Sequence, residues 1–156
     1  MLTRAAVALG SNLGNRAGHL RYGASRLTAL LRDLRVSSYF ETAPVGVPLG
    51  QPRFLNAAAV GETRLPPQEL LRAMLAIEAE RGRLRPYTGA PRTLDLDLIL
   101  YGDRVIDEPE LVVPHPRFRE RRFVLEPLAE VAADLVDPST GKTIEQLLNL
   151  LPAATD

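Results

Sequence analysis

Two aspartates separated by one residue carry the clearest chemical signal in the sequence. Asp95 and Asp97 alternate with leucines from Leu94 onward, which is the two-residue period of a β-strand. Both carboxylates therefore face one side of that strand, about 7 Å apart. Their repulsion calls for a positive charge between them, either arginine or a hard divalent cation such as Mg²⁺. A solvated strand face is the alternative, although aspartate is depleted in strands.

Arginines that could bind phosphate surround this pair in the sequence. Arg83, Arg85 and Arg92 precede it, and a guanidinium keeps its charge at any working pH and matches the shape of a phosphate. Arg92 is the nearest, and phosphoryl-transfer sites combine metal-binding carboxylates with cationic groups in this way. His115 lies between two prolines and could bond to a phosphate, act as a general acid or simply occupy a turn. We expect surface roles for the remaining candidates, Arg81, Arg119, Arg122 and His19.

A second group of side chains suits a flat heterocycle. Asn56 follows Phe54 by two residues, so both face the same side of a predicted strand. An amide can pair in two directions with the edge of a pterin or purine, or it can simply bond to backbone. Phe54 and Phe123 could cover the faces of such a ring, although each alone is more often a core residue.

Composition excludes several classes of function. The 156 residues have a formal net charge of zero and no cysteine, which argues against nucleic-acid or anionic-membrane binding and excludes thiolate chemistry. No run approaches the roughly 18 apolar residues of a membrane span. Neither a phosphate-binding loop ending in Gly-Lys-Ser/Thr nor a Gly-x-Ser-x-Gly elbow is present. We expect one cytoplasmic domain over residues 1–156.

Hydrophobic periodicity predicts the elements that position these groups. The expected order is β-α-β-β-α-β, an α+β ferredoxin-like antiparallel sheet with two helices on one face and a C-terminal helical extension. Loops and the tail are left for the other face, where a ligand site could form. The expected strands cover residues 4–9, 34–41, 54–64, 94–100 and 105–106, the helices 16–31 (capped by Asn15), 67–80, 117–125 and 143–150, and two long loops 42–53 and 81–91.

The segment Pro91-Arg92-Thr93-Leu94-Asp95-Leu96-Asp97 resembles the signature of the 6-hydroxymethyl-7,8-dihydropterin pyrophosphokinase family of folate biosynthesis. The resemblance continues, in family order, through residues 9–14, 38–46, 54–58, 77–85, 113–116 and 121–128. The chain departs from many members at residues 87–90, where an Arg-Trp-Gly segment is absent. It departs from some members at Glu110, where they have arginine, and at Pro116, where they have tyrosine.

The resemblance implies transfer of a diphosphate from ATP to the pterin hydroxymethyl group, with release of AMP. Asp95 and Asp97 would hold two Mg²⁺ ions and would be catalytic together with Arg83 and Arg92. The implied ATP-binding residues are Glu78, Arg83, Arg85, Arg92, Leu98, His115 and Arg121, and the implied pterin-binding residues are Thr42, Pro44, Val45, Phe54, Asn56 and Phe123.

Two other activities remain as alternatives, and the expected partners follow from the resemblance. The partners are ATP and 6-hydroxymethyl-7,8-dihydropterin, with no nucleic acid or membrane, and we expect a monomer. A palm-like nucleotidyl transferase would also use paired aspartates but would need a polynucleotide groove. A non-enzymatic ferredoxin-like small-molecule-binding module would not need both carboxylates beside Arg92.

Overall fold

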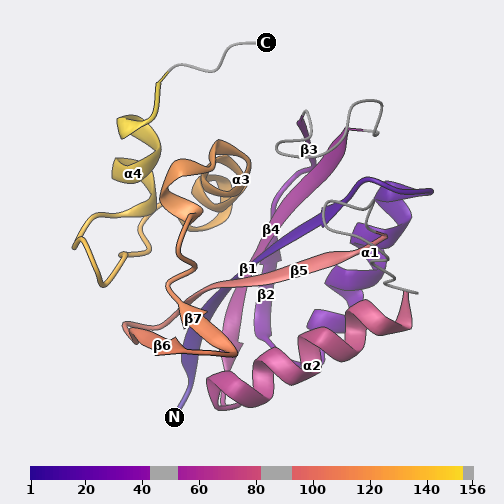
Figure 1. Ribbon diagram of the computed structural model, residues 1–156, viewed down its shortest axis with the longest axis horizontal. Helices are drawn as coiled ribbons and strands as arrows, with labels where there is room; N and C mark the ends of the chain where they lie inside the picture. The colour runs from indigo at the N-terminus through magenta and orange to yellow at the C-terminus, as the bar shows by residue number, and fades with distance from the viewer. Residues whose placement is uncertain (43–52, 82–92, 153–156) are drawn as a thin grey trace.

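An antiparallel sheet forms the centre of the computed structural model, which describes residues 1–42, 53–81 and 93–152 (Figure 1). Its strands follow the order β2-β4-β1-β5, and β3 also pairs with β4. The bounds are Thr3–Ser11 for β1, Arg32–Val36 for β2, Phe40–Thr42 for β3, Phe54–Thr63 for β4 and Asp95–Tyr101 for β5. This order, with every neighbouring pair antiparallel, is the predicted ferredoxin-like sheet.

Helices α1 (Arg16–Leu27) and α2 (Pro67–Glu80) cover one face of the sheet. Alternate residues of β1, such as Val7 and Leu9, meet buried side chains of these helices, such as Leu20 and Met74. Asn15 caps α1 by accepting a hydrogen bond from the backbone of Gly18, as its position in the sequence predicts. Proline at the first position of α2 also agrees with the prediction.

The C-terminal part of the chain covers the opposite face. Figure 1 shows α3 (Arg122–Ala132) and α4 (Ile144–Leu150) together, across the sheet from α1 and α2. A short 3-10 helix, η1 (Phe118–Glu120), precedes α3. Buried residues of α3 and α4, including Leu125, Leu128 and Ile144, pack with Ala58 and Val60 of β4. The C-terminal elements η1, α3 and α4 therefore cover part of the sheet face that the ferredoxin-like pattern leaves open.

Four predicted boundaries are wrong. The strand expected at 34–41 is divided into β2 and β3 because Ser37 exchanges hydrogen bonds with Ala58 and Glu130 holds Ser38. Helix α1 ends at Leu27, where the Thr28 hydroxyl bonds back to the carbonyl of Ser25. The helix expected at 117–125 is instead η1 followed by the longer α3. The short strand expected at 105–106 is β6 (Ile106–Glu108), paired with an unexpected β7 (Leu111–Val113).

Among the described residues, no helix combines the length and the apolar character that crossing a membrane requires.

Candidate active site

One row of residues crosses three strands on the face that α3 and α4 cover. Gly10 of β1 pairs with Asn56 of β4 on one side and with Asp95 of β5 on the other. All three belong to the same face, because their strand neighbours Ala8, Ala58 and Ile99 pack toward α3 and α4. A Cβ at Gly10 would lie 3.4 Å from Asn56 Oδ1. Glycine therefore places no side chain between the amide and the carboxylate.

Asp95 and Asp97 stand in the alternating pattern that the sequence predicts. They pair with Gly10 and Ala8, while Leu96 and Leu98 are buried on the opposite face. Both aspartates are partly buried. Within the described ranges, no three or more histidine, aspartate or glutamate side chains converge as a ready metal cage. Two carboxylates on one face nevertheless fit Mg²⁺, which takes one or two carboxylates and completes its shell with water and substrate phosphates.

Glu78 binds the backbone of β5 at Leu96, the residue between the two aspartates. This residue of α2 is only 2% exposed, and its Oε2 accepts a 2.6 Å hydrogen bond from the backbone N–H of Leu96. β5 is at the edge of the sheet, where backbone groups on the outer side have no strand partner. Glu78 therefore supports β5 at the position where its two carboxylates project.

The amide of Asn56 has a fixed orientation. Its Nδ2 donates to the Thr42 hydroxyl at 2.7 Å and to the Phe40 carbonyl at 3.5 Å. Thr42 in turn pairs with Phe54, which places Phe54, Thr42 and Asn56 at one end of the β3–β4 ladder. With Nδ2 engaged by β3, Oδ1 is the atom that faces Gly10.

His115 reaches the same face through an irregularity in β5. The register of β1 and β5 shifts between Ala6 and Val7, which leaves Ile99 as an extra residue, and the Ile99 carbonyl accepts the backbone N–H of His115 at 2.9 Å. The ring Nδ1 accepts the N–H of Arg117 at 3.3 Å, which assigns the ring proton to Nε2. Burial and then the charge of Arg121 lower the pKa of His115, whereas Asp95 acts in the opposite direction. Near neutral pH the ring is a neutral donor through Nε2.

Arg121 and Phe123 complete this side of the site from the start of α3. The Arg121 guanidinium carbon lies 5.6 Å from the centroid of the Phe123 ring. Phe123 is partly buried and packs against the hydrophobic cluster that α3 and α4 form with the sheet. A guanidinium cation and an aromatic ring thus come from positions two residues apart.

Two predicted ATP-binding residues have side chains away from this face. Leu98 is 5% exposed and packs in the core between the sheet and α1 and α2, so a contact with ATP would need its backbone. Glu78 lies on that side too, behind β5. The predicted residues Pro44, Val45, Arg83, Arg85 and Arg92 lie outside the described residues.

All four residues expected to be surface groups have defined partners. Arg122 donates to Glu126 at 3.1 Å and to the backbone carbonyl of Pro152. Arg119 makes a bidentate ion pair, with N–O distances of 2.6 and 2.9 Å, to the fully buried Asp137. Arg81 donates to Nδ1 of His19 at 2.8–3.1 Å and lies over the Tyr22 ring. The sequence does not indicate the partners of Arg119 and Arg81, because they are 18 and 62 residues away, beyond the reach of a local pattern.

Sequence reasoning also missed Arg16 and Glu41, which form an ion pair at 2.9 Å between α1 and β3. Their separation of 25 residues leaves no local signal.

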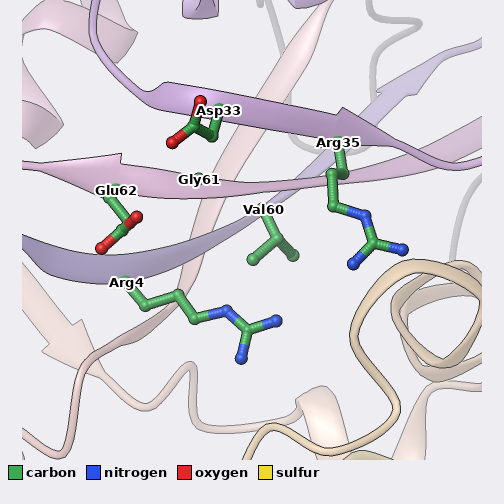
Figure 2. A pocket seen from close by; sticks show the side chains of 6 residues that line it. All are labelled: Arg4, Asp33, Arg35, Val60, Gly61 and Glu62. Atoms are coloured by element: carbon green, nitrogen blue, oxygen red, sulfur yellow. The ribbon is translucent and has the colours of Figure 1, made fainter.

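A cavity of about 330 Å³ lies elsewhere, at the end of β4 away from Phe54. Figure 2 shows Val60 between the side chains of Arg4 and Arg35, with Asp33 and Glu62 nearby. Two cations and two carboxylates line it, so it has no net charge to favour an anion. None of the predicted site residues that the structure describes lines this cavity.

The chain is similar to proteins of one family along most of its length. A family model described as 7,8-dihydro-6-hydroxymethylpterin-pyrophosphokinase matches residues 6–133. A 2-amino-4-hydroxy-6-hydroxymethyldihydropteridine pyrophosphokinase of Synechocystis is 46% identical over 92% of this chain and 74% of its own length. The protein of that name from Pseudomonas aeruginosa is 42% identical over 97% and 94%.

A solved structure shares the fold. The wild-type HPPK-DHPS of Plasmodium falciparum with pteroate matches with a TM-score of 0.73 at 15% identity. The match covers 96% of this chain and 42% of that one, so this chain spans less than half of the solved protein.

Proposed function

Because the chain belongs to the 7,8-dihydro-6-hydroxymethylpterin-pyrophosphokinase family, we propose that the face carrying Asn56, Gly10 and Asp95 is its active site. The chain is a pyrophosphokinase of folate synthesis that transfers a pyrophosphoryl group from ATP to hydroxymethyldihydropterin. Family membership replaces the two alternatives left open by the sequence, a nucleotidyl transferase and a non-enzymatic binding module.

We assign metal binding to Asp95 and Asp97. Two Mg²⁺ ions bound with ATP would neutralise charge on the triphosphate and make the β-phosphorus more electrophilic. The support is the donor set: two carboxylates on one face of β5, with Glu78 holding the strand between them. Asp95 lies close enough to His115 to act on its charge, as Arg121 does, and Asp97 shares the strand face of Asp95.

The pterin would lie over the β3–β4 end of the row. Asn56 Oδ1 can accept from an N–H on the edge of the heterocycle, while Thr42 keeps Nδ2 engaged. Phe54 and Phe123 would stack on the two faces of the ring. Pro44 and Val45 are further pterin-binding candidates from the sequence.

The phosphates would bind nearer to β5 and α3. The Nε2–H of His115 and the guanidinium of Arg121 are donors suited to phosphate oxygens. From the sequence we add Arg83, Arg85 and Arg92 as phosphate-binding groups, and Glu78 and Leu98 as residues near ATP. The pterin hydroxymethyl oxygen would attack the β-phosphorus. As that bond forms, the bond from the β-phosphorus to the α–β bridging oxygen breaks, AMP leaves and the hydroxyl proton is released.

One observation carries this proposal: Gly10 pairs with both Asn56 and Asp95. Asn56 and Asp95 are two strands apart, which corresponds to about 10 Å. This distance leaves room for a bicyclic ring and its hydroxymethyl group between the amide proposed to bind the pterin and the carboxylate proposed to bind the metal. The test is release of AMP from ATP and Mg²⁺ with and without 6-hydroxymethyl-7,8-dihydropterin. We expect release only with the pterin; equal release in its absence, or none in its presence, would reject the proposal.

We also propose a monomeric cytoplasmic enzyme without nucleic-acid or membrane partners. The zero net charge supports only the last part, the absence of nucleic-acid and anionic-membrane partners.

A further inference from the structure

Arg16, the first residue of α1, joins the two strands of the β3–β4 pair at their connected end. One guanidinium nitrogen donates to Glu41 Oε2 at 2.9 Å, and the other donates to the backbone carbonyl of Arg53 at 2.7 Å. Glu41 belongs to β3, and Arg53 directly precedes β4. A single side chain therefore holds both strands from the α1 side of the sheet.

The residues next to these two acceptors are those of the predicted pterin site. Thr42 follows Glu41, Phe54 follows Arg53, and Thr42 and Phe54 pair directly across the ladder. Successive side chains in a strand point to opposite faces. Glu41 therefore faces α1 and Arg16, whereas Thr42 projects to the other face, where its hydroxyl accepts from Asn56.

The energetics of this contact favour a role in orientation over a role in global stability. The side chains of Arg16 and Glu41 are 28% and 49% exposed, and an ion pair as exposed as this adds little to folding. The planar guanidinium fork nevertheless fixes two acceptors in one geometry, which an ammonium group cannot do. Its bond to the Arg53 carbonyl acts on the backbone immediately before Phe54.

We infer that Arg16 is a positioning residue for the pterin: it sets the relative placement of Thr42 and Phe54 and, through Thr42, the orientation of the Asn56 amide. The inference rests on the proposed function, because it takes these three residues to bind the pterin. It assigns no contact between Arg16 and either substrate.

The test compares substrate affinities of Arg16→Ala with those of Arg21→Ala, a matched control at an exposed arginine of the same helix. Binding of 6-hydroxymethyl-7,8-dihydropterin is measured with a non-hydrolysable ATP analogue present, and binding of the analogue is measured alone. We expect Arg16→Ala to weaken pterin binding about tenfold, the effect of losing hydrogen bonds to a charged group. Affinity for the ATP analogue should stay unchanged, and Arg21→Ala should match the wild type in both measurements.

Two further variants separate positioning from folding. Arg16→Lys keeps the charge and can serve one acceptor, so it should recover part of the pterin affinity. Glu41→Gln keeps the shape and an acceptor oxygen while removing the charge, and it should weaken pterin binding less than Arg16→Ala does. Near-UV circular dichroism confirms the fold of each.

Two results would overturn the inference while leaving the proposed function intact. One is pterin affinity within about twofold of wild type in Arg16→Ala, inside the usual scatter for an uncoupled site. The other is an equal loss of affinity for both substrates, which marks a general structural role. A wild-type chain that releases no AMP in the presence of the pterin would instead reject the proposed function.

Discussion

Glu78 on α2 accepts a hydrogen bond from the backbone N–H of Leu96, the residue between Asp95 and Asp97. The contact is 2.6 Å long, and Glu78 is 2% exposed. Glu78 thus binds the backbone of β5 from one face of the sheet, at the residue between Asp95 and Asp97, whose side chains belong to the other face. The backbone between the two aspartates is therefore held by a residue that does not share their face.

Replacing Glu78 with leucine should weaken both the fold and metal binding. The change leaves the Leu96 N–H buried without this acceptor, which costs about 1–3 kcal/mol of unfolding free energy. Urea denaturation measures the loss, and the Mg²⁺ concentration that half-saturates AMP release should rise. Glu78→Gln is the control, because its amide oxygen can still accept. Unchanged Mg²⁺ dependence in Glu78→Leu would show that the strand keeps its geometry without Glu78.

Replacing Gly10 with valine should block the space between Asn56 and Asp95. A Cβ there already lies 3.4 Å from Asn56 Oδ1 and 3.7 Å from Phe54 Cδ1, so the added methyl groups of valine extend into this space. Valine suits a strand, and pterin binding should suffer more than folding, by about tenfold or more. Gly10→Ala, which makes only ordinary contacts, should lose less. Pterin affinity in Gly10→Val equal to the wild type would place the ligand elsewhere.

Glu80 should stabilise the protein in a way that depends on pH. Hydrogen bonds from Arg26 and from the Tyr22 hydroxyl lower the pKa of Glu80 from 4.5 to about 2. A carboxyl group with a depressed folded-state pKa stabilises the fold above its unfolded pKa, and this contribution is lost as the pH falls toward the folded value. The wild type should therefore exceed Glu80→Gln in Tm above pH 4.5, and the difference should vanish as the pH approaches 2.

An exposed carboxylate of the same helix provides the control for Glu80. Glu69→Gln removes the same charge without touching Tyr22 or Arg26. A Tm difference between wild type and Glu80→Gln that does not change across this pH range would contradict the account of the Glu80 cluster.

The sequence predicts the site best where local patterns and structure coincide. The alternation around Asp95 predicts both the strand and the shared face of the aspartates, and it is confirmed. Asn15, Pro67 and Thr143 mark helix starts by the chemistry of their own side chains, and all three stand at or next to those starts. Such signals act within a few residues and are therefore visible in one chain.

The remaining features depend on contacts that no local pattern carries. The division of the strand expected at 34–41 requires Glu130, which binds both the backbone and the hydroxyl of Ser38 across 92 residues. The two contacts of Arg16 span 25 and 37 residues. His115 reaches the site because β5 contains an extra residue, Ile99, whose carbonyl binds the His115 backbone. These relationships arise only when the sheet assembles.

The most direct test of the central claim, that Asp95 and Asp97 hold the metal ions for diphosphate transfer, is pterin-dependent AMP release by Asp97→Asn. Asparagine keeps the shape of the side chain while removing the charge that binds Mg²⁺. We predict a fall of about a thousandfold, comparable to losing a main electrostatic group of an active site, with circular dichroism and urea stability unchanged. AMP release close to the wild-type rate, with the same Mg²⁺ dependence, would contradict the claim.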